Sequence, residues 1–141
     1  MKLTDIDTIA GSDTGAKLEL RHPATGEKLE GSWIKLAGPD SKIAKQRRAE
    51  IRRKMRRTGR QGLDFDALEA EAAETRVAVT LSWGGIELEN GAVKCTADNV
   101  RKVYEDFPWI AEQVDEFQGD RANFIGSSSK SAASTSDSEL G

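Results

Sequence analysis

Hydrophobic and polar residues alternate in two stretches near the start of the chain. Leu18 and Leu20 alternate with charged residues, as do Trp33 or Ile34 with Leu36 in the second stretch. A period of two residues is typical of β-strands with one buried face. The sequence PATG at residues 23–26 suits a turn, because proline fixes φ and glycine accepts positive φ. We therefore expect a β-hairpin over residues 16–37, or a small antiparallel sheet.

Two helices are predicted after this hairpin. Pro39-Asp40-Ser41 is a helix-start signal and Gly59 follows the segment, which predicts a helix over residues 41–58. Acidic residues then open a second segment, as a helix dipole favours, and we predict a helix over residues 64–82. The end of this second helix is ambiguous, because its apolar residues from position 77 onward also alternate as in a strand.

The last third of the chain predicts a turn and two further helices. Asn90-Gly91 favours a turn or short hairpin, and Thr96 can cap a helix over residues 97–106. Pro108 suits the first position of a second helix over residues 108–125. We expect these two helices to supply the helical core through Val100, Val103, Tyr104, Phe107, Trp109, Ile110, Val114 and Phe117.

The predicted fold class is α+β, with the hairpin or small sheet followed by a bundle of about four helices. A length of 141 residues fits a single domain, which we place at residues 16–126. Residues 1–15 are polar and are predicted to be a flexible arm. Residues 127–141 are rich in serine and have little to bury, so we predict a disordered tail.

The sequence gives no support for a catalytic or metal centre. One histidine and one cysteine, His22 and Cys95, cannot form a zinc site of the usual composition, and no phosphate-binding glycine loop is present. No apolar run is long enough to cross a membrane, and the first residues lack the apolar core of a signal peptide. We therefore predict a protein without enzymatic activity or cofactor that is made and kept in the cytoplasm.

Positive charge is concentrated in residues 42–60, which hold ten Lys and Arg and one acid, whereas the whole chain has a net charge of −3. Nucleic acid could be the partner, because each arginine can neutralise a phosphate. No aromatic residue is interleaved to stack on bases, and acidic segments lie on both sides. An acidic partner, either the helix from residue 64 onward or another protein, is therefore the favoured interpretation.

Two stretches resemble a known family. HPATGEKLEGSWIKLAGPDSKI at residues 22–43 is similar to a hairpin followed by a helix start in tail assembly chaperones of long-tailed bacteriophages. LSWGGIELENGAVKCTADNVRKVYEDFPWIAEQVDEFQGDRANFI at residues 81–125 is similar to the C-terminal half of the same proteins. The resemblance covers residues 17–125 and excludes the basic block and the serine-rich end.

The resemblance implies a protein that coats the long, helical tape-measure protein and keeps it soluble and extended during assembly of the tail tube. It also implies association with further copies of itself, a location in the cytoplasm of the infected bacterium, and absence from the mature virion. In that family a ribosomal frameshift near the end of the gene yields a longer form, and we expect the slip within the serine-rich stretch. The residues predicted to contact partners are Arg47, Arg48, Arg52, Arg53, Arg56, Arg57, Trp83, Tyr104, Phe107, Trp109, Phe117 and Phe124.

Two other functions remain open from the sequence. The chain could be a structural component of the virion, such as a minor tail or head-completion protein, with the hairpin used for permanent assembly. It could also be a small nucleic-acid-binding protein that uses residues 42–60.

Overall fold

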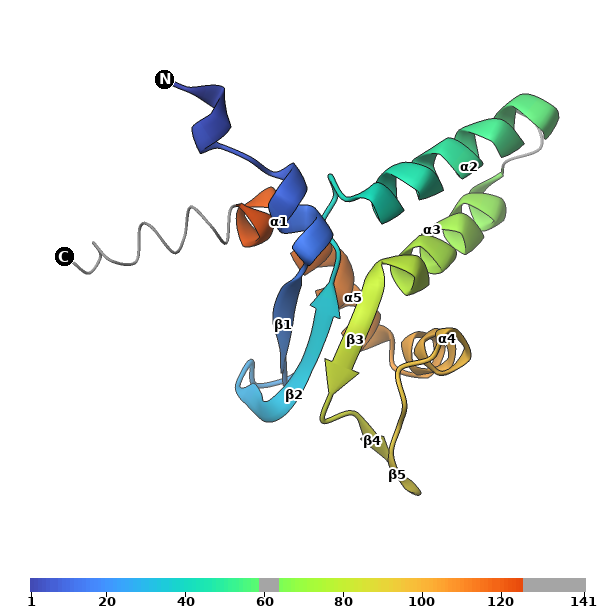
Figure 1. The fold of residues 1–141 in the computed structure, drawn as a ribbon. Coiled ribbons are helices and arrows are strands. Elements are labelled where there is room, and N and C mark those ends of the chain that lie inside the picture. Colours follow the sequence, from blue (N-terminus) through green and yellow to red (C-terminus); the bar gives the residue numbers. More distant parts are fainter. Residues whose placement is uncertain (59–63, 126–141) are drawn as a thin grey trace.

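A three-stranded antiparallel sheet forms the centre of the molecule. The computed structural model describes residues 1–58 and 64–125. Strands β1 (Ala16–Arg21), β2 (Lys28–Leu36) and β3 (Thr80–Gly84) lie in the order β1–β2–β3 (Figure 1). The predicted hairpin and the α+β class are therefore confirmed, and β3 adds the third strand.

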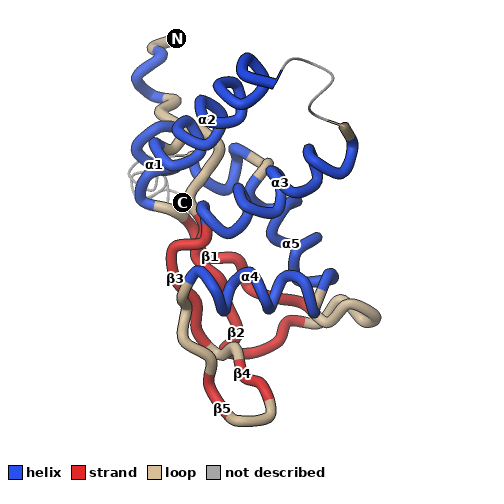
Figure 2. Tube along the Cα trace, turned by 90° about the vertical axis from the view of Figure 1, so that its right-hand side faces the viewer, coloured by secondary structure: helices blue, strands red, loops and turns tan. Residues whose placement is uncertain are grey.

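Helices cover one face of this sheet and form the core with it. Helix α5 (Pro108–Gln118) contacts β1 and β2, and α4 (Ala97–Asp106) packs against α5 (Figure 2). Alternate residues of the strands point toward these helices, and Ile34 on the central strand is fully buried. Of the predicted helical core, Val100, Val103, Tyr104, Ile110 and Val114 are buried, whereas Phe107, Trp109 and Phe117 are half-buried against it.

A side-chain amide fixes α5 on the edge of the sheet. Gln113 of α5 donates from Nε2 to the carbonyl oxygen of Arg21 at 2.8 Å and accepts from its backbone N–H at 3.0 Å. Both main-chain groups of this β1 residue are thereby satisfied as a neighbouring strand would satisfy them. This end of β1 is closed to pairing with another strand, because the amide already occupies it.

Helices α2 (Lys42–Thr58) and α3 (Phe65–Val79) pack side by side and project from the sheet as an arm (Figure 1). The Ser41 hydroxyl accepts a hydrogen bond from the N–H of Ala44 at 3.1 Å, so the predicted start of α2 is confirmed. Below, "the arm" means α2 together with α3.

The prediction of a helix over residues 64–82 is wrong at its C-terminal end. Helix α3 stops at Val79, and residues 80–84 form β3, whose Trp83 pairs with Ile34 of β2. Alternating apolar residues fit either structure locally, and the free edge of β2 decides between them because it offers a ladder of hydrogen bonds. The short hairpin predicted at Asn90-Gly91 is confirmed as β4 (Glu87–Leu88) and β5 (Gly91–Ala92).

The N-terminal end of the described chain is more structured than predicted. Helix α1 (Ile9–Thr14) lies against the 3₁₀ helix η3 (Arg121–Phe124), and a further short turn, η1, spans Leu3–Asp5. Ser12 is fully buried and its carbonyl accepts from Gly38, so residues 9–14 are not a loose arm.

The helix predicted over residues 108–125 is interrupted in the structure. Its α-helical part ends at Gln118, and Gly119 separates it from η3. The side chain of Asp120 then caps η3 by accepting from the N–H of Ala122 at 3.0 Å. The predicted disordered tail over residues 127–141 lies outside the described residues.

An ion pair between Asp40, just before α2, and Arg121 of η3 predicts that acid destabilises the contact between these two parts of the chain. Arg121 hydrogen-bonds this carboxyl at 2.8 Å and, with a smaller contribution from Thr8, lowers the pKa of Asp40 from 3.8 to about 2. Because the folded pKa is the lower one, the stabilisation is complete above the unfolded value and is lost as the pH falls from about 4 to about 2.

We therefore expect the free energy of unfolding to fall less steeply in Asp40→Asn than in the wild type over this pH range. Chemical denaturation at pH 5, 4, 3 and 2 measures the difference. Asp5→Asn is the control, since Asp5 is exposed and forms no ion pair with the described residues. Equal slopes for the wild type and Asp40→Asn would contradict the assignment.

Candidate protein-binding surfaces

Part of the basic segment is neutralised within the arm. Glu71 of α3 accepts from Arg47 at 2.8 Å and from Lys54 at 2.7 Å, and Arg47 also pairs with Glu50 at 2.7 Å. Arg47 donates further to the hydroxyl of Thr75 at 3.2 Å. The hydrogen bonds from Lys54 and Arg47 lower the pKa of Glu71, so this carboxylate stays charged and holds the two helices together.

The remaining arginines of α2 have no such partner. Arg47 and Lys54 are seven residues apart and face α3, which places Lys45, Arg52 and Arg56 on the opposite side of the helix, with Arg53 and Arg57 on one flank. All of these are exposed and form no ion pair within residues 1–58 and 64–125. We call this surface the basic face of α2; it comprises Lys45, Arg52, Arg53, Arg56 and Arg57.

Arg48 lies next to the basic face but is tied to the body of the protein. Its Nη1 atom donates to the carbonyl oxygen of Pro39 at 2.9 Å, and the side chain is otherwise exposed. Of the six arginines predicted to contact partners, Arg47 and Arg48 thus serve mainly local contacts. Arg52, Arg53, Arg56 and Arg57 remain available.

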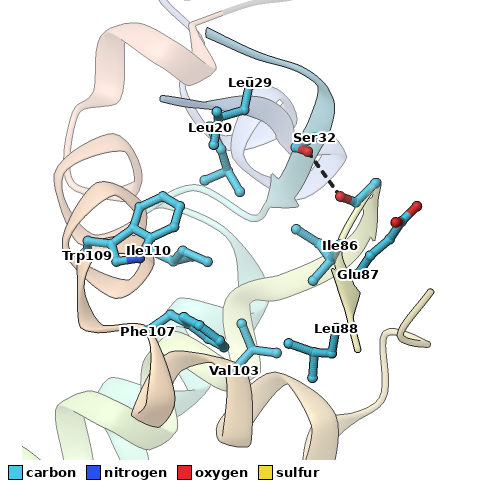
Figure 3. Close-up of a pocket in the computed structure, with 11 residues that line it drawn as sticks. Leu20, Leu29, Ser32, Ile86, Glu87, Leu88, Val103, Phe107, Trp109 and Ile110 are labelled. Carbon is cyan, nitrogen blue, oxygen red and sulfur yellow. Dashed lines mark hydrogen bonds between the residues drawn. The ribbon is translucent and has the colours of Figure 1, made fainter. Parts of the chain in front are cut away.

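A second candidate surface is an apolar pocket of about 160 Å³ between the sheet, β4 and the α4–α5 junction (Figure 3). Phe107 and Trp109 form one side, and Ile86 and Leu88 lie across from them. We call this the apolar pocket; its lining also includes Leu20, Leu29, Ser32, Gly85, Glu87, Val103 and Ile110. Two of the predicted partner-binding aromatics thus share one cavity.

Local backbone features shape the pocket. Phe107 ends α4 with φ −128° and ψ 74°, and Pro108 begins α5 directly afterwards, so the chain turns sharply between Phe107 and Trp109. On the other side, the Ser32 hydroxyl donates to the carbonyl oxygen of Gly85 at 3.0 Å. This bond fixes the start of the β4–β5 hairpin against β2.

The other predicted partner-binding aromatics hold the fold together. Trp83 donates from Nε1 to the carbonyl oxygen of Val93 at 2.8 Å. Tyr104 is buried and its hydroxyl lies 2.7 Å from that of Thr80, and burial raises the pKa of Tyr104 to about 12. Their positions favour a structural role over contact with a partner.

Phe117 and Phe124 also contribute to packing. Their rings meet edge to face with centroids 5.6 Å apart, joining α5 to η3. Phe124 is buried and Phe117 is half-buried, so their positions also favour a structural role over contact with a partner.

Exposed apolar residues at the far end of the arm were not among the predicted contact residues. Phe65 is 74% exposed, Leu68 is 47% exposed, and Met55 of α2 is 39% exposed. The spacing of Phe65, Leu68 and Ala72 on one helical face was a signal in the sequence. Nothing in the sequence, however, indicated that the outer end of this stripe would be left exposed by the described parts of the chain.

The described residues contain no cluster of three or more His, Cys, Asp and Glu side chains suited to a metal ion. Burial raises the pKa of the Cys95 thiol, which makes the reactive thiolate less abundant at neutral pH. In residues 1–58 and 64–125, no helix has the length and apolar character needed to cross a membrane.

Comparison of the chain with models of protein families, with curated proteins and with solved structures found no match.

Proposed function

We propose that this protein is a tail assembly chaperone of a long-tailed bacteriophage, which binds the tape-measure protein and keeps it soluble and extended. The observation that carries the proposal is the basic face of α2, displayed along an arm that projects from the sheet (Figure 1). The resemblance at residues 22–43 and 81–125 supplies the identity of the client.

The basic face suits an extended helical client. Helix α2 has 17 residues and is therefore about 25 Å long at 1.5 Å per residue. Its four free arginines lie in the last two turns, and Lys45 extends the basic face toward the start of the helix. These side chains can pair with carboxylates on a helix lying beside α2, and arginine forms such pairs well because its guanidinium is bidentate. Charge complementarity of this kind increases association rates and selects partners.

The proposal includes the other expected properties of such a chaperone. It acts in the cytoplasm of the infected bacterium, associates with further copies of itself and is left out of the virion. A longer, frameshifted form carries an additional domain after the serine-rich stretch. A structural virion protein would instead be found in purified particles, so mass spectrometry of particles separates these two functions.

Co-expression with the product of the gene directly downstream tests client binding. We expect the wild type to keep this long, helix-rich protein in the soluble fraction and to co-purify with it. Arg52→Glu/Arg53→Glu should weaken capture by about tenfold or more, because it reverses the charge in the middle of the basic face.

Lys94→Glu/Lys102→Glu is the matched control, since it makes the same charge change at exposed positions outside the arm. Circular dichroism checks that all variants are folded. Equal capture by both double variants would overturn the role of the basic face, and failure of the wild type to capture the client would overturn the proposed function.

Nucleic acid is the second candidate, favoured by the same unpaired arginines. Helix α2 carries no aromatic residue, so base stacking from this surface is absent. Binding of the wild type to duplex DNA should therefore be weak at physiological salt. Tight binding that falls steeply with salt and disappears in Arg52→Glu/Arg53→Glu would instead support this second candidate.

A further inference from the structure

We propose that Phe65 at the tip of the arm of one copy inserts into the apolar pocket of a second copy, so that copies associate head to tail. This deepens the self-association included in the proposed function by assigning the two surfaces that make the contact. The inference itself rests on the exposed tip, the pocket and the charges around each.

The tip presents an aromatic ring that is held in place and that none of the residues 1–58 and 64–125 covers. Asp64 caps α3 by accepting from the N–H of Ala67 at 2.9 Å, so Phe65 is fixed in the first helical turn. The Phe65 side chain is nevertheless 74% exposed, and Leu68 one turn further on is 47% exposed. An aromatic side chain on an ordered helix is a typical anchor for a protein interface, because little side-chain freedom is lost on binding.

The apolar pocket has the size and lining for one aromatic ring. Its volume of about 160 Å³ is close to that of an engineered protein cavity of about 150 Å³ that binds benzene. Phe107 and Trp109 on one side and Leu88 on the other provide aromatic and aliphatic contacts (Figure 3). A phenyl ring entering from outside would therefore meet apolar atoms on both sides.

The arm cannot fill the pocket of its own chain. Both views place the far ends of α2 and α3 at the opposite end of the molecule from the β4–β5 hairpin, which forms one wall of the pocket (Figures 1 and 2). The ring and the pocket can meet only if they belong to different copies.

The charges around the two surfaces are complementary. Arg56 and Arg57 lie in the last turn of α2, next to the start of α3. The pocket side carries Glu87, Glu89 and Asp106, all exposed and without an ion pair among the described residues. Opposite charges around a central apolar anchor orient two partners before the anchor enters.

Acidic residues at the tip do not cancel this complementarity. Asp64, the cap of α3, and Asp66 are both negative, but the last two turns of α2 carry four exposed arginines without an ion pair among the described residues, so positive charge prevails at this end of the arm. Because the tip and the pocket are different surfaces, the contact is heterologous. Repetition of a heterologous contact builds chains, or rings where the rotation closes.

Mixing two variants tests the contact. Phe65→Ala removes the anchor and keeps the pocket, whereas Leu88→Glu places a charge at the pocket wall and keeps the anchor; Leu88 is 40% exposed, so the substitution leaves the core intact. In sedimentation velocity with purified, nuclease-treated protein, we expect the wild type to form species larger than dimers. Each variant alone should be monomeric, with at least a tenfold increase in the apparent dissociation constant.

An equimolar mixture of the two variants should form a one-to-one dimer and nothing larger, because it contains one intact anchor–pocket pair. Leu3→Ala and Leu3→Glu are the matched controls, since Leu3 is 76% exposed and lies outside both surfaces; they should associate like the wild type. A monomeric wild type, unchanged association of Phe65→Ala, or a mixture that stays monomeric would each overturn the proposal.

This experiment is separate from client capture, because no client is present. A wild type that associates as described but fails to capture the downstream gene product would overturn the proposed function and leave the contact between copies standing. Capture of the client without any association of copies would overturn the contact between copies and leave client binding standing.

Discussion

Replacement of Ile34 by alanine is expected to lower the free energy of unfolding by about 2–5 kcal/mol, through lost burial and the cavity left behind. Ile34 is fully buried on the central strand, where it pairs with Leu18 of β1 and Trp83 of β3. Its side chain lies where the sheet meets the helices, so neighbouring residues on several elements would have to move to fill the space.

Chemical denaturation of both proteins measures this difference. Leu81→Ala is the control in the same sheet, because Leu81 lies on β3 and is 37% exposed. It should cost clearly less than Ile34→Ala, because part of Leu81 already contacts water whereas Ile34 is fully buried. A similar loss in both variants would show that the core does not lie between the sheet and α4–α5.

The elements that the sequence predicted correctly depend on local signals. The β1–β2 hairpin has alternating apolar residues and a turn with proline and glycine, and the start of α2 has a serine cap whose hydrogen bond is formed. The same holds for α4, where Thr96 accepts from the N–H of Asn99 at 3.2 Å, and for α5, where Pro108 occupies the first turn. In each case residues near in sequence determine the conformation, so no knowledge of the fold is needed.

The elements that were missed depend on contacts distant in sequence. Residues 80–82 become a strand because β2, more than 40 residues earlier, offers a free edge. Helix α1 is ordered because Ser12 is buried and its carbonyl accepts a hydrogen bond from Gly38. The sequence of either segment alone gives no information on these distant partners.

The candidate surfaces also depend partly on local sequence and partly on contacts between residues distant in sequence. A concentration of arginine is visible in the sequence, but which arginines remain unpaired depends on Glu71 reaching both Arg47 and Lys54. Phe107 and Trp109 were expected to contact partners, yet the pocket that they line also needs Leu20 from β1 and Leu88 from β4. The exposure of Phe65 follows from the projection of the arm, which only the fold reveals.

Replacement of Gly85 by alanine is expected to destabilise the protein and to deform the apolar pocket. Gly85 has φ +70°, in the left-handed region where a side chain costs about 1–2 kcal/mol. A Cβ atom there would also overlap the carbonyl oxygen of Gly31, a backbone atom that cannot move without shifting β2. Because Gly85 begins the connection to β4, relief of this overlap must displace the hairpin that carries Leu88.

Gly26→Ala is the matched control, because Gly26 has a similar φ of +77° but a Cβ atom there would meet nothing within 4 Å. Both substitutions place a side chain in the left-handed region. We therefore expect Gly26→Ala to lower the free energy of unfolding by about 1–2 kcal/mol and Gly85→Ala by clearly more. Only Gly85→Ala should also weaken the association of copies at protein concentrations and temperatures where both variants remain folded. Equal stabilities would mean that Gly31 and Gly85 approach each other less closely, and the firm wall that the pocket requires would then be missing.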